Sequence, residues 1–200
     1  MTATTERKRS ISRADLWDDA RYAAERKAVR QRMVELKRRR RCAVGPVCTF
    51  YFESWDTMWA QIQEMLHIEK GGEAQVADEL AAYNPLVPQG RELVATVMFE
   101  IEDPQRRHAL LSRLGGVEKT FYLEVGGKRS GAVAEEDVER TKSDGKTSSI
   151  HFLHFPLDDR QASAFKHPGA RVVLGVEHPE YGHMAVMPEE TRAALSADLD

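Results

Sequence analysis

The chain has 200 residues, of which 42% are hydrophobic and 30% charged. This size and balance are typical of one large domain, or one domain with an extension, and they exclude a disordered polypeptide. No apolar run approaches the ~18 residues of a membrane-spanning helix, and the N-terminal residues lack the apolar core of a secretory signal. We therefore expect a cytoplasmic protein with no membrane association. It should have a disordered tail over residues 1–11 and a single domain over residues 12–200.

The net charge of −3 conceals an uneven distribution. Residues 1–41 carry 14 Lys and Arg against 6 Asp and Glu, whereas the remaining 159 residues carry 15 against 26. A basic arm is thus joined to an acidic body. The arm can pack on the body through charge complementarity, or it can offer a contact surface to nucleic acid or to an acidic partner protein.

A long helix is predicted within the basic arm, residues 12–44. Ser12 and Asp15 have the spacing of a capping box, and sparse apolar residues as far as Arg41 predict one narrow buried stripe. Cations at the end of such a helix stabilise its C-terminus. The same cations are the candidate partner-binding residues. Phosphate binding is less well supported, because no aromatic residue is interleaved with them to stack on bases. The candidate partner-binding cations are Arg38, Arg39, Arg40 and Arg41.

Residues 45–90 are predicted to form one strand and two helices. Gly45-Pro46 breaks the chain, and the β-branched and aromatic run at 47–53 predicts a strand. Apolar residues at steps of three and four predict a helix from Ser54 or Asp56 to Glu69, and a shorter helix follows from Glu73 to Tyr83. Four polar residues in the first helix or directly after it lie largely off its apolar stripe. They are Gln61, Gln63, Glu64 and Lys70.

The longest predicted strand covers Glu92–Glu102, after a proline-rich turn at residues 84–90. Its first half is apolar on both faces, which places it in the centre of a sheet, whereas its second half should reach solvent.

The rest of the chain repeats one order of elements. Residues 91–134 are predicted as a strand, a helix and a hairpin at Gly126-Gly127; after a polar loop, residues 148–187 repeat that order before a C-terminal helix. We interpret these as two β-α-β-β units, related by duplication or by chance alternation. The predicted fold class is α+β, with a mainly antiparallel sheet or partly open barrel and peripheral helices.

No catalytic residue and no cofactor are predicted, because the nucleophile-elbow, phosphate-loop and dinucleotide-binding patterns are absent from the sequence. Glu64-x-x-His67 matches half of a di-iron carboxylate motif, but it has no second copy on a predicted helix, so a polar pair on a helix surface is preferred. Cys42 and Cys48 fit a reduced compartment and lack the spacing of a zinc site or a redox pair.

A turn near the C-terminus carries three weak candidate metal ligands. His178 and His183 flank the turn, and Glu180 lies within it. Across a hairpin these side chains would come close enough to share an ion, although a polar hairpin end is the preferred interpretation.

Four polar residues lie where the predicted helix from Glu73 to Tyr83 meets the predicted strand that begins at Glu92, around the proline-rich turn at residues 84–90. Such junctions line ligand pockets, although Asn before Pro is also ordinary turn chemistry. The candidate ligand-binding residues are Tyr83, Asn84, Arg91 and Glu92.

Three stretches carry a resemblance to a known family: GPVCTFYFESWDTMWAQIQEML, AYNPLVPQGRELVATVMFEIED and HPEYGHMAVMPEETRAALSADL. They resemble an uncharacterised bacterial family known as domain of unknown function 3501, and the resemblance extends from about Ser12 to Asp198. It implies no activity, cofactor or catalytic residue. It implies genes encoded beside a rubrerythrin-like di-iron protein and an iron–sulfur oxidoreductase, and thus peroxide or redox metabolism.

Three functions follow as hypotheses. The preferred one is a non-catalytic accessory or binding protein that works with rubrerythrin-like and iron–sulfur proteins. The second is a metal-dependent enzyme or metal-binding protein without a recognisable motif. The third is an RNA-binding module that uses the basic N-terminal helix, whose affinity would fall steeply with salt.

Overall fold

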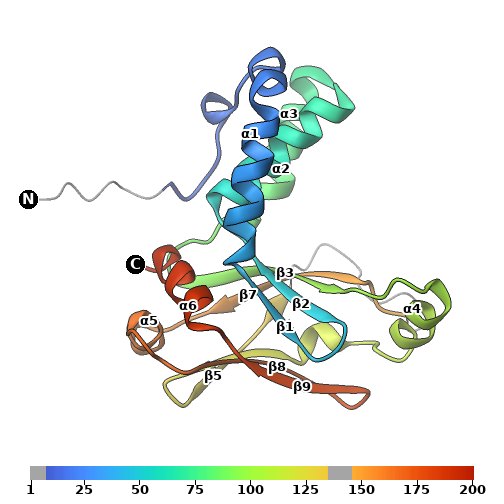
Figure 1. The fold of residues 1–200 in the computed structure, drawn as a ribbon, viewed down its shortest axis with the longest axis vertical. Helices are drawn as coiled ribbons and strands as arrows, with labels where there is room; N and C mark the ends of the chain where they lie inside the picture. Colours follow the sequence, from blue (N-terminus) through green and yellow to red (C-terminus); the bar gives the residue numbers. More distant parts are fainter. Residues whose placement is uncertain (1–7, 135–145) are drawn as a thin grey trace, which may run out of the picture.

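The computed structural model describes residues 8–134 and 146–200 (Figure 1). Part of the predicted tail and most of the predicted polar loop lie outside these ranges. Within the described ranges, no helix combines the length and the apolar character needed to cross a membrane. The helices are α1 (Asp19–Arg38), α2 (Trp55–Glu69), α3 (Gly72–Tyr83), α4 (Pro104–Leu111), α5 (Asp159–Lys166) and α6 (Glu189–Leu195), with 3-10 turns η1 (Arg13–Asp15), η2 (Asn84–Leu86), η3 (Val117–Lys119) and η4 (Ser196–Asp198).

The strands form two sheets. The first has the order β1-β2-β3-β7-β6 and the second β5-β4-β8-β9, and every pairing among the described residues is antiparallel. The α+β prediction is thus confirmed, and over residues 8–134 and 146–200 the strands form two open sheets and no closed barrel. The strands are β1 (Arg41–Val44), β2 (Cys48–Phe52), β3 (Glu92–Phe99), β4 (Phe121–Val125), β5 (Lys128–Gly131), β6 (Val133–Ala134), β7 (Ile150–Pro156), β8 (Val172–His178) and β9 (Tyr181–Val186).

Strand β3 lies in the middle of the five-stranded sheet, as its two apolar faces predict. Its inner face joins the core between the sheets, where the Phe50 ring lies 5.6 Å from Phe121 and 6.0 Å from Phe155. Its outer face carries Val94, which is fully buried under the helices. One strand therefore connects two apolar clusters, because alternate side chains point to opposite faces.

The two predicted β-α-β-β orders are present, and they interlock. Strand β3 of the first order pairs with β7 of the second, and β4 pairs with β8 in the other sheet. Each sheet therefore takes its central pair from both halves of the chain. Duplication of the halves stays a prediction.

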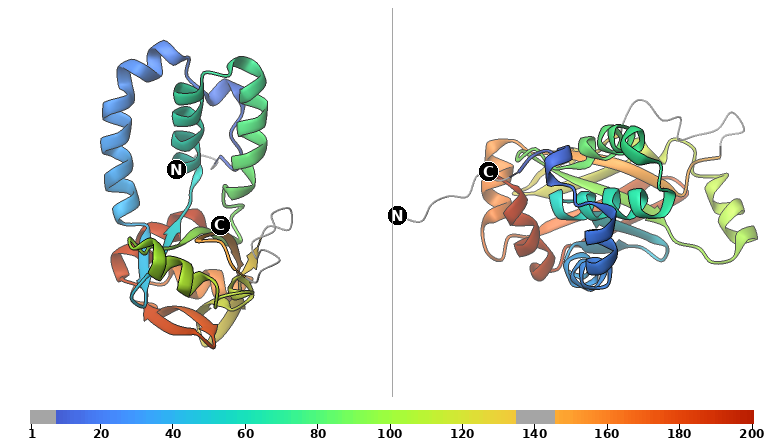
Figure 2. Two further views of the ribbon diagram at one scale, coloured as in Figure 1. Left: turned by 90° about the vertical axis from the view of Figure 1, so that its right-hand side faces the viewer. Right: turned by 90° about the horizontal axis from the view of Figure 1, so that it is seen from above.

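Helices α1, α2 and α3 rise together from the outer side of the five-stranded sheet (Figures 1 and 2). A second apolar cluster holds them, with Val29 and Met33 from α1, Ile62 from α2 and Val76 from α3. These three helices form the helical layer of the protein.

The single helix predicted from residue 13 to residue 41 is divided in the structure. Ser12 caps only the η1 turn, and α1 begins after Asp18, whose side chain accepts a 2.8 Å hydrogen bond from the Arg21 amide. The helix ends at Arg38, and Arg41 already belongs to β1.

Strand β1 was not predicted, because its stability depends on its partner. It pairs Cys42 with Phe50 and Val44 with Cys48, all buried, so tertiary packing overrides the local basic pattern. The turn of this hairpin uses Gly45 at φ +74°, a conformation that favours glycine.

Residues 8–11, predicted as part of a disordered tail, are packed on the body. Ile11 is buried in the helical-layer cluster. The Arg9 guanidinium donates to the carbonyls of Pro88 at 3.0 Å and Asp198 at 2.9 Å, and it also pairs with the Asp200 carboxylate. The N-terminal segment and the C-terminus thus meet beside the turn that precedes β3.

Candidate functional site

The four candidate ligand-binding residues do not converge on one site. Asn84 clamps the N-terminal segment: its Oδ1 accepts from the Ile11 amide at 2.6 Å, and its Nδ2 donates to the Ile11 carbonyl at 2.9 Å. Glu92 pairs with His154 at 2.9 Å, and Arg91 forms a 3.4 Å ion pair with Asp159. Of the four, Tyr83 reaches a cavity.

That cavity lies between the helical layer and the outer face of the five-stranded sheet, with a volume of about 380 Å³. We call it the sheet cavity. Apolar and aromatic residues of α2, α3, η2 and the three strands β2, β3 and β7 form much of its wall, and polar groups complete it. Its lining residues are Lys37, Arg40, Tyr51, Phe52, Glu53, Met58, Gln61, Tyr83, Leu86, Thr96, Met98, Ile150 and Phe152.

Glu53 is the buried acid of the sheet cavity, with 7% of its surface exposed. Its Oε2 accepts from the Thr57 hydroxyl at 2.6 Å, and its Oε1 accepts from the Thr96 hydroxyl at 2.7 Å. Two hydroxyl donors use only part of the capacity of a carboxylate, which can accept about four hydrogen bonds. The sheet cavity therefore combines apolar walls with a polar group that retains accepting capacity.

A groove between α1 and α2 adjoins this cavity. The groove has a volume of about 540 Å³, and it shares Lys37, Tyr51 and Gln61 with the sheet cavity. We call it the helix groove. Its apolar lining includes Val34, which is 66% exposed. Its basic rim consists of Arg30, Lys37, Arg38 and Arg41.

The predicted cluster Arg38–Arg41 is not one continuous docking surface. Arg38 and Arg39 lie 3.5 and 3.1 Å from the Glu190 carboxylate on α6. Arg41 is exposed on β1 and lines the helix groove.

Arg40 is a structural residue, which corrects its assignment to partner binding. It is 4% exposed. Its guanidinium donates to the carbonyls of Phe52 at 3.0 Å and Glu53 at 2.7 Å, and it forms an ion pair with Asp198. A planar guanidinium can serve several acceptors at once, because its N–H donors point in different directions within one plane. Its partners lie 12 to 158 residues away in the chain, so no local pattern could identify it.

Glu64 and His67 connect α2 to α1. Glu64 Oε2 accepts from the Tyr22 hydroxyl at 2.9 Å and from Arg26 Nε at 3.1 Å, and this hydrogen bond to Arg26 lowers the pKa of Glu64 to about 2. His67 Nδ1 lies 2.6 Å from Asp19 Oδ1. The two side chains thus bind different partners on α1, in the manner of an interhelical polar contact.

The three weak metal candidates engage separate partners. His178 Nε2 lies 3.3 Å from the Gly115 carbonyl, and Glu180 forms a 3.3 Å ion pair with Arg113. The His183 ring packs against Tyr181, with centroids 4.5 Å apart. Within residues 8–134 and 146–200, no three His, Cys, Asp or Glu side chains are grouped to hold a metal ion.

Both cysteines are free and buried, in β1 and β2. Burial raises the pKa of Cys42 to about 11 and of Cys48 to about 12. Because the thiolate is the nucleophile and the metal ligand, both side chains act as small apolar residues at neutral pH.

Comparison with known proteins identifies a family and a structural relative. The model of the family described as "Protein of unknown function (DUF3501)" matches residues 10–199. A crystal structure of a novel protein of unknown function from Burkholderia pseudomallei K96243 has a TM-score of 0.88 and 38% sequence identity, and the match covers 96% of this chain and 100% of that one. No curated protein matches the chain. These matches confirm the predicted family resemblance, whereas the genomic neighbours stay a prediction.

Proposed function

The chain belongs to the DUF3501 family of proteins of unknown function, and from that premise we propose that it is a non-catalytic binding protein. Its binding surface is the helix groove together with the sheet cavity. The observation that supports this proposal is that the two lie side by side: an apolar groove with a basic rim shares the lining residues Lys37, Tyr51 and Gln61 with a cavity of about 380 Å³. Concave, mostly apolar surfaces with a few polar groups are typical of binding sites.

The chemistry of the surface favours an acidic, partly apolar protein segment as its partner. The cations of the rim would pair with Asp or Glu of the partner and accelerate its association, because complementary charge steers encounter. The exposed Val34 and the cavity beyond it would receive apolar side chains. Following the family resemblance, we propose a rubrerythrin-like di-iron protein or an iron–sulfur oxidoreductase of the cytoplasm as that partner.

The RNA-binding hypothesis has less support than it had from the sequence. Arg40 is buried, and Arg38 and Arg39 share Glu190, so fewer cations face outward than the run suggests. The hypothesis of a metal-dependent protein also stays a prediction, and no feature of the described residues favours it over a binding protein.

Titration calorimetry with the purified rubrerythrin-like and iron–sulfur proteins of the same organism tests the proposal. The informative variant is Lys37→Glu with Arg41→Glu, which reverses two exposed cations of the helix groove. The matched control is Arg160→Glu with Arg171→Glu, which reverses two exposed cations outside the helix groove.

The groove variant should bind at least about tenfold more weakly, and the control should change affinity by less than about twofold. Raising the salt concentration should slow association of the wild type, because screening removes electrostatic steering. Equal affinity in both variants would exclude the helix groove as the interface. Absence of binding to either purified protein would exclude the proposed partners.

A further inference from the structure

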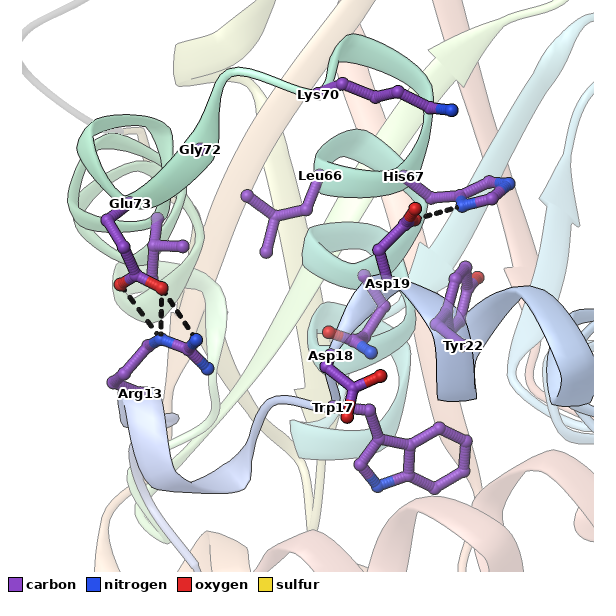
Figure 3. Close-up of a pocket in the computed structure, with 12 residues that line it drawn as sticks. Arg13, Trp17, Asp18, Asp19, Tyr22, Leu66, His67, Lys70, Gly72 and Glu73 are labelled. Carbon is purple, nitrogen blue, oxygen red and sulfur yellow. Dashed lines mark hydrogen bonds and ion pairs between the residues drawn. The ribbon is translucent and has the colours of Figure 1, made fainter.

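A second cavity lies between the ends of helices α1, α2 and α3 (Figure 3). Figure 1 shows that these helix ends point away from the sheets. The cavity has a volume of about 410 Å³, between the start of α1, the second half of α2 and the start of α3. We call it the helix-tip cavity. Trp17, Leu66 and Val76 contribute its apolar lining. Its volume falls within the range of small-molecule sites, about 300–1,000 Å³.

Gln63 is the unusual residue of this cavity. It lies on α2 with 2% of its surface exposed, and it lines the helix-tip cavity. Its amide nitrogen Nε2 is buried and has no hydrogen-bond partner among the described residues. An unpaired buried amide costs folding free energy, and such groups in native proteins call for an explanation. A ligand that accepts a hydrogen bond from Gln63 would supply one, after a rotation of the side chain that turns the covered amide nitrogen toward the cavity.

The charged groups around the cavity are mostly paired, which favours a neutral ligand. Arg13 donates to both carboxylate oxygens of Glu73, at distances from 2.7 to 3.2 Å, and His67 pairs with Asp19 at 2.6 Å (Figure 3). A ligand with a net charge would have to compete with these pairs. A neutral ligand would leave them intact.

We propose that the helix-tip cavity binds a small, neutral, planar heterocycle with an amide-like edge, as in a nucleobase or a nicotinamide ring. The carboxamide of a glutamine both donates and accepts, so it pairs in two places with such an edge, as glutamine does with adenine in DNA recognition. The indole of Trp17 and the aliphatic side chains would cover the ring. This site shares Tyr22 with the helix groove but none of the residues changed to test the proposed function, so the two proposals are tested independently.

The test uses adenine, uracil and nicotinamide as probes of the full-length protein, with binding followed by saturation-transfer NMR and titration calorimetry. The wild type should bind at least one probe with a Kd below about 1 mM. The variant Gln63→Leu keeps the side-chain volume and removes the amide, and it should weaken that binding at least about tenfold. Gln105→Leu changes an exposed glutamine on α4, outside both cavities and the helix groove, and it should leave the affinity unchanged.

Stability provides an independent readout. Because the Gln63 amide nitrogen has no partner, Gln63→Leu should melt at or above the temperature of the ligand-free wild type. A clearly lower melting temperature would show that the amide has a partner in solution, and it would overturn the proposal. So would a wild type that binds none of the probes at millimolar concentration, or a Gln63→Leu protein that binds them equally well. Tighter binding of toluene, which lacks an amide-like edge, would identify a plain apolar cavity instead.

Discussion

Arg40→Ser should unfold the protein far more easily than the same change at the next position, Arg41→Ser. The Arg40 guanidinium is buried and serves three partners: the carbonyls of Phe52 and Glu53, and the Asp198 carboxylate, whose side chain is only 13% exposed. A serine in its place leaves the two carbonyls without this donor and removes the cation beside a nearly buried carboxylate. Breaking a buried ion pair in this way costs about 3–5 kcal/mol.

The neighbouring change should be nearly neutral. Arg41 is exposed on β1, and surface substitutions usually alter stability by no more than about 0.5 kcal/mol. Because a domain is stable by only about 5–15 kcal/mol, the Arg40 variant should lose a large part of its folding free energy.

Urea unfolding followed by circular dichroism measures the difference. With a slope of about 2–3 kcal/mol/M, the Arg40→Ser midpoint should fall by about 1–2 M, and the Arg41→Ser midpoint should stay within about 0.2 M of the wild type. The reasoning would be refuted by equal shifts in the two variants. In a binding assay the Arg41 variant should be the one affected, because Arg41 lines the helix groove. Arg41→Ser should weaken partner binding without loss of stability.

Three further predictions concern other contacts. Arg26 lowers the pKa of Glu64 in the folded protein to about 2. Ionised Glu64 therefore adds stability above its usual pKa, and this stability is lost as the pH falls toward 2. In thermal melts, Glu64→Gln should cost about 1–2 kcal/mol of folding free energy at pH 7, allowing for partial exposure, and almost nothing at pH 2. Gly175→Ala would place a Cβ 2.1 Å from the Tyr122 ring and should cost about 1–3 kcal/mol in urea unfolding, whereas Gly131→Ala, with nothing within 4 Å, should cost little. Asn84→Ala should speed amide exchange across the N-terminal segment, and unchanged exchange would contradict the clamp.

The sequence predicts those features that local pattern determines. Apolar residues on both faces identified β3 as a central strand, and steps of three and four identified α2. It could not predict features that depend on distant partners. Arg40 belongs to an obvious surface-like basic run, yet its carboxylate partner is 158 residues away.

The burial of Gln63 on α2 is another feature that the sequence could not predict. Gln63 lies off the apolar stripe of α2, so periodicity predicts a solvent-facing residue. In the structure α2 contacts both α1 and α3, and Gln63 is covered. A hydrophobic stripe reports one packed face, whereas a helix between two others is covered on more than one side. No pattern in this sequence marks that second contact.

The interlocked pairing of the two halves has a consequence for any attempt to divide this protein. Strand β3 pairs with β7, and β4 with β8, so a fragment containing one half alone would expose long unpaired strand edges in both sheets. Separate fragments should therefore aggregate when produced singly and reconstitute one another when produced together. A protease that cuts between the halves would leave a nicked protein whose two pieces stay associated until they are denatured.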